Sequence, residues 1–228
     1  MPKHSEENRL LALYSLGILD TGYEERFDRL TRIAGKIFNV PISLISLVDK
    51  ERQWFKSSHG TDIRSTPRTE SFCKYVIENA GPLIVKDAIE DPRFKNSNLV
   101  KNIPYVRFYA GYPVKLPDGE IAGSICIIDT NPRDFSEEEL GFLSDLAKIV
   151  EDEFRIINMA TTDSLTGLIN RRLFSIITKE ILKKSRKRNK VFCVVIIDLN
   201  DFKPINDNFG HAEGNQALIK FSTILENA

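Results

Sequence analysis

The sequence has little of what marks an exported, membrane-spanning or nucleic-acid-binding protein. No apolar run reaches the ~18 residues that a membrane-spanning helix needs, and the N-terminus MPKHSEENRL is too polar for a signal peptide. The 32 basic and 32 acidic residues cancel, so no net charge favours nucleic acid or a membrane surface. We therefore expect a cytoplasmic protein with neither of those partners.

Cysteines are scarce and scattered. Cys73, Cys126 and Cys193 are an odd number and lie far apart in the chain. This pattern is typical of reduced thiols and favours neither a disulfide framework nor a zinc site. A cysteine without a neighbouring histidine is more often an inert buried thiol than a reactive one. The spacing of Cys73 and Cys126 accordingly gives no support to a thiol catalyst, which needs clustered reactive cysteines.

The chain has enough apolar residues for ordinary soluble cores. Its 228 residues, 42% of them apolar, suit one or two domains. Hydrophobic periodicity and turn residues predict, in order, a helix over 24–39, strands over 42–49 and 52–58, a helix over 70–79, a strand over 83–85, and a hairpin of 107–116 and 120–129. This order predicts an α+β fold, with helices packed on a mixed or antiparallel sheet.

A long helix is predicted to connect the two halves of the chain. Ser136 and Glu139 have the spacing of a capping box that opens a helix. Apolar residues then recur at alternating spacings of three and four, at Leu140, Leu143, Ala147, Val150, Phe154, Ile157 and Thr161. This seam indicates a parallel coiled coil, and we expect a homodimer through residues 140–161. The alternative is a helix docked on the sheet of its own chain. Leu146 and Ile149 widen the apolar stripe of the helix, and a broad stripe suits this packing equally well.

Residues 191–215 combine an apolar run with a polar, turn-rich segment. The run from 191 to 197 is short and rich in β-branched residues, which predicts a buried strand that ends at Asp198. This acid either meets a cation or hydrogen-bond donors, or caps the helix that follows. An EF-hand calcium loop is excluded, because it needs Asp or Asn at Phe202 and Gly at Lys203. A phosphate-binding P-loop is excluded because no GxxxxGK[ST] occurs.

Two motifs stand on either side of this predicted strand. The first is DSLTGLINRR, from Asp163 to Arg172. The second fits the pattern D-[LIV]-D-x-F-K-x-[IV]-N-D-x-x-G-H-x-x-G-D at Asp198, Leu199, Phe202, Lys203, Ile205, Asn206, Asp207, Gly210, His211 and Gly214. Together they resemble the GGDEF family, the diguanylate cyclases. The resemblance implies that residues 162–228 form part of an α/β unit of the nucleotidyl-cyclase palm type.

The same resemblance implies a magnesium-assisted condensation of two GTP molecules to cyclic di-GMP. Asp198 would supply a carboxylate and Leu199 its carbonyl oxygen to the metal, and both are hard ligands that suit Mg²⁺. The backbone of Asp201, Phe202 and Lys203 would approach the phosphates.

Guanine recognition is implied at Asn206, which would hydrogen-bond the base. The sequence departs from the family at Asn200, which replaces the usual second acid at little cost, and at Asn215. Asn215 stands where the family has an aspartate that accepts the N–H donors of guanine. An amide offers one acceptor oxygen and no charge, so guanine binding should weaken by about 1–2 kcal/mol.

Phrases in the first half of the chain also recur in a known order. They are LD (19–20), ERFD (25–28), VD (48–49), RQWFK (52–56), PR (67–68), SFC (71–73), DA (87–88), DPRF (91–94) and RFYAG (107–111). This series resembles a GAF domain of the kind found ahead of bacterial signalling domains. It implies a small-molecule sensor or dimerisation module over residues 1–155, with 136–161 as the connecting helix.

A ligand pocket of this domain should lie between the sheet and the segment around residues 68–109. Its expected lining consists of Trp54, Phe55, Phe72, Cys73, Arg107 and Tyr109. In the alternative, the aromatic side chains belong to the core, and Arg68 and Arg107 pair with Asp87 or Asp91. Cys73 is a candidate for redox chemistry or tetrapyrrole attachment, against the simpler reading of an inert thiol. The ligand itself has no signature in the sequence.

The sequence contains no GG[DE]EF segment, with its second metal-binding acid. We therefore expect a GAF-regulated cyclase protein of which this chain, as given, makes no cyclic di-GMP. The alternative is a stand-alone GAF module for small-molecule binding or dimerisation, with a vestigial GGDEF remnant.

Overall fold

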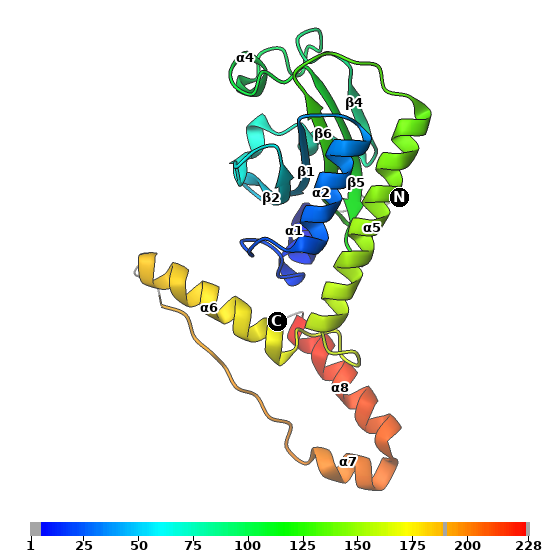
Figure 1. Cartoon of the computed structure of the whole chain (residues 1–228). Helices are drawn as coiled ribbons and strands as arrows, with labels where there is room; N and C mark the ends of the chain where they lie inside the picture. The colour runs from blue at the N-terminus through cyan, green and yellow to red at the C-terminus, as the bar shows by residue number, and fades with distance from the viewer. Residues whose placement is uncertain (1–5, 189–190, 227–228) are drawn as a thin grey trace. The chain divides into compact units, whose positions relative to one another are not determined.

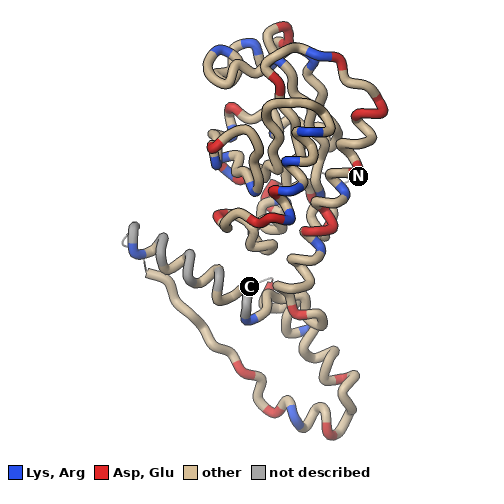
Figure 2. The backbone as a smooth tube through the Cα atoms, in the orientation of Figure 1, with Lys and Arg blue, Asp and Glu red and all other residues tan. Residues whose placement is uncertain are grey.

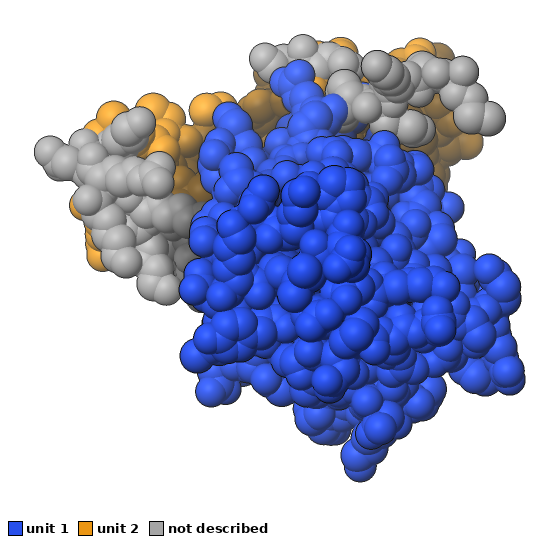
Figure 3. All heavy atoms as spheres, turned by 90° about the horizontal axis from the view of Figure 1, so that it is seen from above, with its two compact units in different colours: residues 1–157 blue, residues 158–228 orange. Residues whose placement is uncertain are grey.

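The computed structural model describes residues 6–188 and 191–226. The chain divides into two compact units, residues 1–157 and 158–228 (Figures 1 and 3). Figure 2 shows acidic and basic residues interspersed along the first unit, in keeping with the neutral net charge. Within the described ranges, no helix combines the length and apolar character that crossing a membrane requires.

The first unit is built on a six-stranded sheet in which every neighbouring pair is antiparallel. The strands are β1 (Ile42–Val48), β2 (Arg52–His59), β3 (Ser65–Pro67), β4 (Leu83–Val85), β5 (Phe108–Lys115) and β6 (Ile121–Asp129), in the spatial order β3-β2-β1-β6-β5-β4. The predicted strands and hairpin are confirmed, and β3 is an addition. β1 lies at the centre and is buried along its whole length, which explains why five of its seven residues are apolar.

Helices cover both faces of this sheet, so the unit has two cores (Figure 1). On one face lie α1 (Glu6–Ser15), α2 (Glu25–Ile37) and α5 (Glu137–Thr161). On the other lie the 3-10 turn η1 (Arg68–Glu70) and the short helices α3 (Cys73–Asn79) and α4 (Asn98–Lys101). Because side chains alternate along a strand, Leu44 faces the second core and Ile45 the first.

Helix α5 places its apolar seam against its own sheet. Leu143, Ala147, Val150 and Phe154 are buried in the core with α2 and β1, and the rings of Phe154 and Phe27 lie 5.9 Å apart. The prediction that this seam pairs two copies is therefore wrong for these residues, and the docked alternative holds. In a helix of seven turns a heptad seam and a core-facing stripe use nearly the same spacing, so the sequence does not separate them.

The predicted capping box is present at the start of α5. The Glu139 amide donates to Ser136 Oγ (3.2 Å), and the Ser136 amide donates to a Glu139 carboxylate oxygen (2.8 Å). Arg133 pairs with the same carboxylate at 2.5 Å and donates to the Phe38 carbonyl at 2.6 Å. These contacts fix the direction in which α5 leaves the sheet.

Replacing Ser136 with alanine should lower the free energy of unfolding by about 1 kcal/mol, because the amide of Glu139 loses its acceptor. Urea denaturation followed by circular dichroism measures the change. Ser144→Ala, in the middle of α5, is the matched control and should cost nothing, since alanine is the better helix former. Equal losses for both variants would contradict a capping role.

The second unit consists of helices and one extended segment. Its helices are α6 (Arg171–Arg188), α7 (Phe202–Phe209) and α8 (His211–Glu226). Ahead of α6, the Asp163 carboxylate accepts from the amide and hydroxyl of Thr166 at 2.9 and 2.8 Å, and Gly167 has a φ of +74°. The motif beginning at Asp163 thus forms a tight turn into α6, closed by a bridge between Thr162 and Ile169.

The buried strand predicted over residues 191–197 does not form. Residues 191–199 carry no helix or strand, and the side chains of Val191 and Ile196 are 98% and 93% exposed. A strand is stabilised by neighbouring strands and by burial of its faces, and within the described residues no strand pairs with this segment. The amino-acid pattern of residues 191–197 is typical of a strand, but a strand forms only where a neighbouring strand can pair with it.

Candidate functional site

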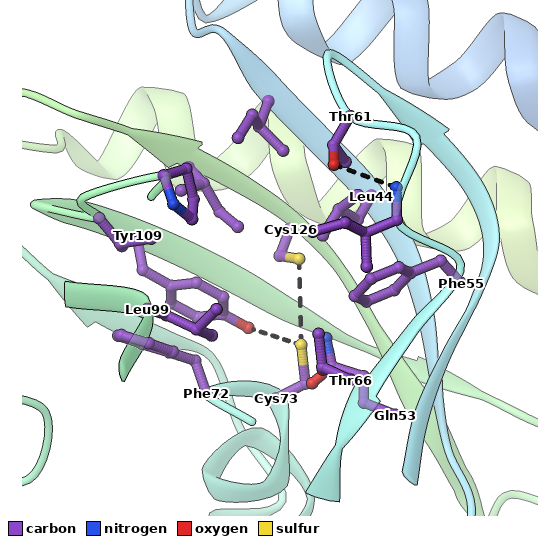
Figure 4. Close-up of a pocket in the computed structure, with 15 residues that line it drawn as sticks. Leu44, Gln53, Phe55, Thr61, Thr66, Phe72, Cys73, Leu99, Tyr109 and Cys126 are labelled. Carbon is purple, nitrogen blue, oxygen red and sulfur yellow. Dashed lines mark hydrogen bonds between the residues drawn. The ribbon is translucent and has the colours of Figure 1, made fainter. Parts of the chain in front are cut away.

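An apolar pocket opens in the first unit between the sheet and the segments that carry α3 and α4 (Figure 4). Its apolar walls come from Ile42, Leu44, Phe55, Ile63, Phe72, Leu99, Pro104, Val106 and Ile128, and its polar or thiol groups from Gln53, Thr61, Thr66, Cys73, Tyr109 and Cys126. The cavity volume is about 60 Å³, which is small for a ligand site. A ligand must therefore be very small unless the walls move.

Four of the six residues expected to line this pocket do so: Phe55, Phe72, Cys73 and Tyr109. Trp54 faces the other core, because it follows Gln53 and precedes Phe55 on β2 and side chains alternate along a strand. Arg107 forms a two-pronged ion pair with Asp87 at 2.8 and 2.6 Å, as in the alternative reading. Trp54 and Arg107 therefore stabilise the fold and do not line the pocket.

Two cysteines meet in the pocket. Cys73 Sγ, at the start of α3, lies 3.9 Å from Cys126 Sγ on β6 and 3.1 Å from the Tyr109 hydroxyl (Figure 4). The same hydroxyl is 3.5 Å from Ser124 Oγ. No local pattern predicts this pair, since the cysteines are 53 positions apart and only the packing of α3 on β6 brings them together. The thiols are clustered after all, and the expectation of isolated thiols is corrected.

These groups shift each other's acidity. Burial works against the Cys73 thiolate, but hydrogen bonds from the Cys126 thiol and surrounding hydroxyls outweigh it and lower the pKa of Cys73 to about 6. The hydrogen bond to Cys73, together with burial, holds the pKa of Cys126 well above its usual value. Burial raises the pKa of Tyr109 as well, so its hydroxyl stays a donor. The arrangement stabilises one thiolate beside one thiol.

On the opposite face of the sheet, Lys56 is a fully buried cation with a structural role. Its Nζ donates to Thr21 Oγ1 (2.8 Å), the Gly22 carbonyl (3.0 Å) and a Glu24 carboxylate oxygen (2.5 Å). Burial lowers the pKa of Lys56, against the effect of the Glu24 carboxylate. With its donors satisfied, Lys56 ties the segment before α2 to β2.

In the second unit, the expected metal and phosphate residues lie where the extended segment meets α7. Asp198 is exposed and Leu199 half-buried, and Asp201 precedes α7 in a left-handed conformation with φ +55°. Phe202 and Lys203 then form its first turn. Among the described residues, no three His, Cys, Asp or Glu side chains gather as a metal cluster. Asp198 and the Leu199 carbonyl remain two oxygen donors of the kind that Mg²⁺ prefers.

Of the two expected guanine residues, Asn206 lies at the contact of α7 with α8. A Cβ atom at Gly214 would lie only 1.9 Å from Asn206 Oδ1, so a larger residue there would force the Asn206 side chain to move. Asn215 follows directly and is exposed. The packing therefore places Asn206 of α7 beside the turn of α8 that carries Asn215.

Comparison with known families assigns both units. A model of the GAF domain matches residues 22–153, more than half of the chain. The chain belongs to the GAF domain family. A second model, described as "Diguanylate cyclase, GGDEF domain", matches residues 160–228. A GAF domain followed by a GGDEF segment is thus confirmed, as the sequence motifs predict.

Curated relatives of this GAF–GGDEF chain include proteins of cyclic di-GMP metabolism. It is 40% identical over 168 residues to a cyclic di-GMP phosphodiesterase of Pseudomonas aeruginosa, an alignment that covers 73% of this chain and 29% of the relative. It is 30% identical over 164 residues to the diguanylate cyclase DgcP of Escherichia coli, covering 66% and 47%. The chain spans less than half the length of either relative.

Solved structures confirm the GAF fold of the first unit. A GAF domain from an Acinetobacter phosphoenolpyruvate-protein phosphotransferase aligns with a TM-score of 0.50 at 18% identity, covering 67% of this chain and 96% of that one. A free methionine-R-sulfoxide reductase from Neisseria meningitidis, in complex with its substrate, aligns with a TM-score of 0.51 at 17% identity, covering 68% and 92%. At such identities the likeness shows the fold alone.

Proposed function

We propose that the chain is the sensor and nucleotide-binding part of a cyclic di-GMP signalling protein. In this proposal the GAF unit binds a small, largely apolar ligand in the pocket beside Tyr109. Residues 158–228 bind GTP as the first half of a diguanylate cyclase site. The observation that supports the proposal is the close packing of Asn206 against Gly214, because Asn215, the other proposed guanine residue, follows Gly214 directly in the chain.

The chain offers groups for the base and for the phosphates of a nucleotide. The Asn206 amide and the Asn215 amide would bind guanine, and the first turn of α7 would present backbone N–H groups to the phosphates. The GGDEF family suggests a divalent metal, and the oxygens of Asp198 and Leu199 would hold Mg²⁺. When bound there, the metal would offset the negative charge of the phosphates.

A second copy of the chain is the proposed partner of the outer face of α5. Phe142, Ile149 and Ile156 recur every seven residues and are 47%, 45% and 54% exposed. Ion pairs flank them with the same period, Lys148 with Asp145 and Arg155 with Asp152. This spacing supplies one of the two apolar positions per heptad that a two-stranded coiled coil uses, with charged residues beside it. Dimerisation would bring two GTP-loaded units together, as condensation of two nucleotides needs.

Calorimetric titration of the chain with GTP tests the nucleotide half of this proposal. We expect saturable binding in the presence of Mg²⁺, loss of binding in EDTA, and loss in Asp198→Ala. Asp118→Ala, in the turn between β5 and β6, removes an equivalent exposed charge and should bind as the unaltered chain does.

The same samples should release no cyclic di-GMP, because residues 1–228 contain no GG[DE]EF sequence. A folded chain that binds no GTP would contradict the proposal and favour a GAF module with an inert remnant. Turnover of GTP would contradict the expected lack of catalysis.

A further inference from the structure

The Cys73–Cys126 pair has no part in nucleotide binding, yet it combines three features of a reactive site. The sulfurs are 3.9 Å apart, a hydroxyl donor lies 3.1 Å from one of them, and both cysteines line the pocket. We propose that Cys73 and Cys126 form a redox-active dithiol that is oxidised to a disulfide by a small hydroperoxide entering this pocket.

The chemistry assigns a different role to each sulfur. The Cys73 thiolate attacks one peroxide oxygen, the O–O bond breaks, and Cys73 becomes a sulfenic acid while the departing hydroxide takes a proton and leaves as water. The Cys126 thiol then attacks the sulfenic sulfur, its proton leaves with the hydroxyl group as a second water, and the S–S bond forms. Overall, two thiols and one hydrogen peroxide give one disulfide and two waters.

The geometry favours Cys73 as the attacking group. Its sulfur lies 3.1 Å from the Tyr109 hydroxyl and 3.9 Å from Cys126 Sγ, and both groups can donate a hydrogen bond to it once it is ionised, which stabilises the thiolate. Tyr109 also lies where it can donate to the oxygen that carries away the negative charge. Cys126 is the resolving thiol, the one that attacks the oxidised Cys73. Its sulfur is 3.9 Å from Cys73 Sγ, and its raised pKa keeps it protonated.

The pocket selects the oxidant by size. Its free space of about 60 Å³ admits a molecule the size of hydrogen peroxide but excludes larger disulfides such as glutathione disulfide. Closing the sulfurs from 3.9 Å to a bond of ~2.05 Å needs a small movement of α3 on β6. The bond would tie α3 to the strand that precedes α5, so oxidation acts on the element that leads to the second unit.

Peroxide oxidation followed by intact-mass measurement tests this proposal in the whole chain carrying Cys193→Ser, which removes the exposed thiol. One equivalent of hydrogen peroxide should remove two hydrogen atoms from the mass and protect both remaining thiols from N-ethylmaleimide in denaturant. Dithiothreitol should restore both thiols. In the Cys126→Ser variant, Cys73 should instead stop at a sulfenic acid that dimedone traps.

The exposed Cys193 serves as an internal reference in the unaltered chain. We expect Cys73 to be oxidised about tenfold faster than Cys193 at neutral pH, because the Tyr109 hydroxyl beside Cys73 stabilises its thiolate. Tyr109→Phe should slow the oxidation of Cys73 without changing the circular dichroism spectrum. Oxidation of Cys193 while Cys73 and Cys126 stay reduced would overturn the proposal. So would a dimedone adduct on Cys73 that persists with Cys126 present.

Discussion

Replacing Phe154 with alanine should lower the free energy of unfolding of the GAF unit by about 3–5 kcal/mol. Its ring is fully buried between α5 and α2, 5.9 Å from the ring of Phe27, and its removal leaves a cavity that the surrounding helices cannot close. Urea denaturation followed by circular dichroism measures the loss. The oligomeric state, measured by sedimentation at equal protein concentration, should change little while the unit stays folded.

Ile156→Ala is the matched variant, two residues along the same helix. Its side chain is 54% exposed, so we expect a stability change below about 0.5 kcal/mol but weaker self-association. The two variants thus separate the core-facing stripe of α5 from the stripe proposed for a second copy. The reverse result, with Phe154→Ala dissociating a stable unit and Ile156→Ala unfolding it, would contradict the packing of α5 on its own sheet.

Replacing Asn215 with aspartate should tighten GTP binding by about 1–2 kcal/mol, close to tenfold in Kd. The amide of Asn215 presents a single acceptor oxygen, whereas a carboxylate accepts from two N–H donors of guanine and adds charge to both hydrogen bonds. Calorimetry with Mg²⁺ and GTP measures the gain. The effect should be absent with ATP, whose base lacks that pair of donors.

Asn208→Asp provides the control for charge alone. It adds the same negative charge on α7, at an exposed position outside the proposed guanine site. Because a bare negative charge repels the phosphates, this variant should bind GTP no better than the unaltered chain. Weaker binding by both variants would mean that position 215 does not face the base.

The fold of the first unit was largely predictable from the sequence. β1 and the β5–β6 hairpin have local signals, an apolar run and the turn at Pro117–Gly119, and they formed where those signals lie. The period of two along β2 should also have shown that Trp54 and Phe55 cannot line the same pocket. Trp54 and Phe55 are both aromatic, but they lie in different cores, and aromatic character alone does not distinguish the two faces of the sheet.

Other features depend on contacts that no local pattern contains. The segment 191–197 has the composition of a strand, but a strand needs neighbours, and none of the described residues pairs with it. Cys73 and Cys126 meet only because α3 packs on β6. The seam of α5 was seen correctly as apolar, yet whether it faces a second chain or its own sheet is decided by the fold around it.

The most direct test of the proposed function is the relative affinity of the chain for GTP and ATP in the presence of Mg²⁺. Titration of the unaltered chain and of Asn206→Ala with both nucleotides would separate base recognition from phosphate binding. We predict that GTP binds more tightly than ATP, and that Asn206→Ala weakens GTP alone, to the affinity of ATP. Equal affinities for GTP and ATP in the unaltered chain would contradict the assignment of residues 158–228 as a guanine-nucleotide site.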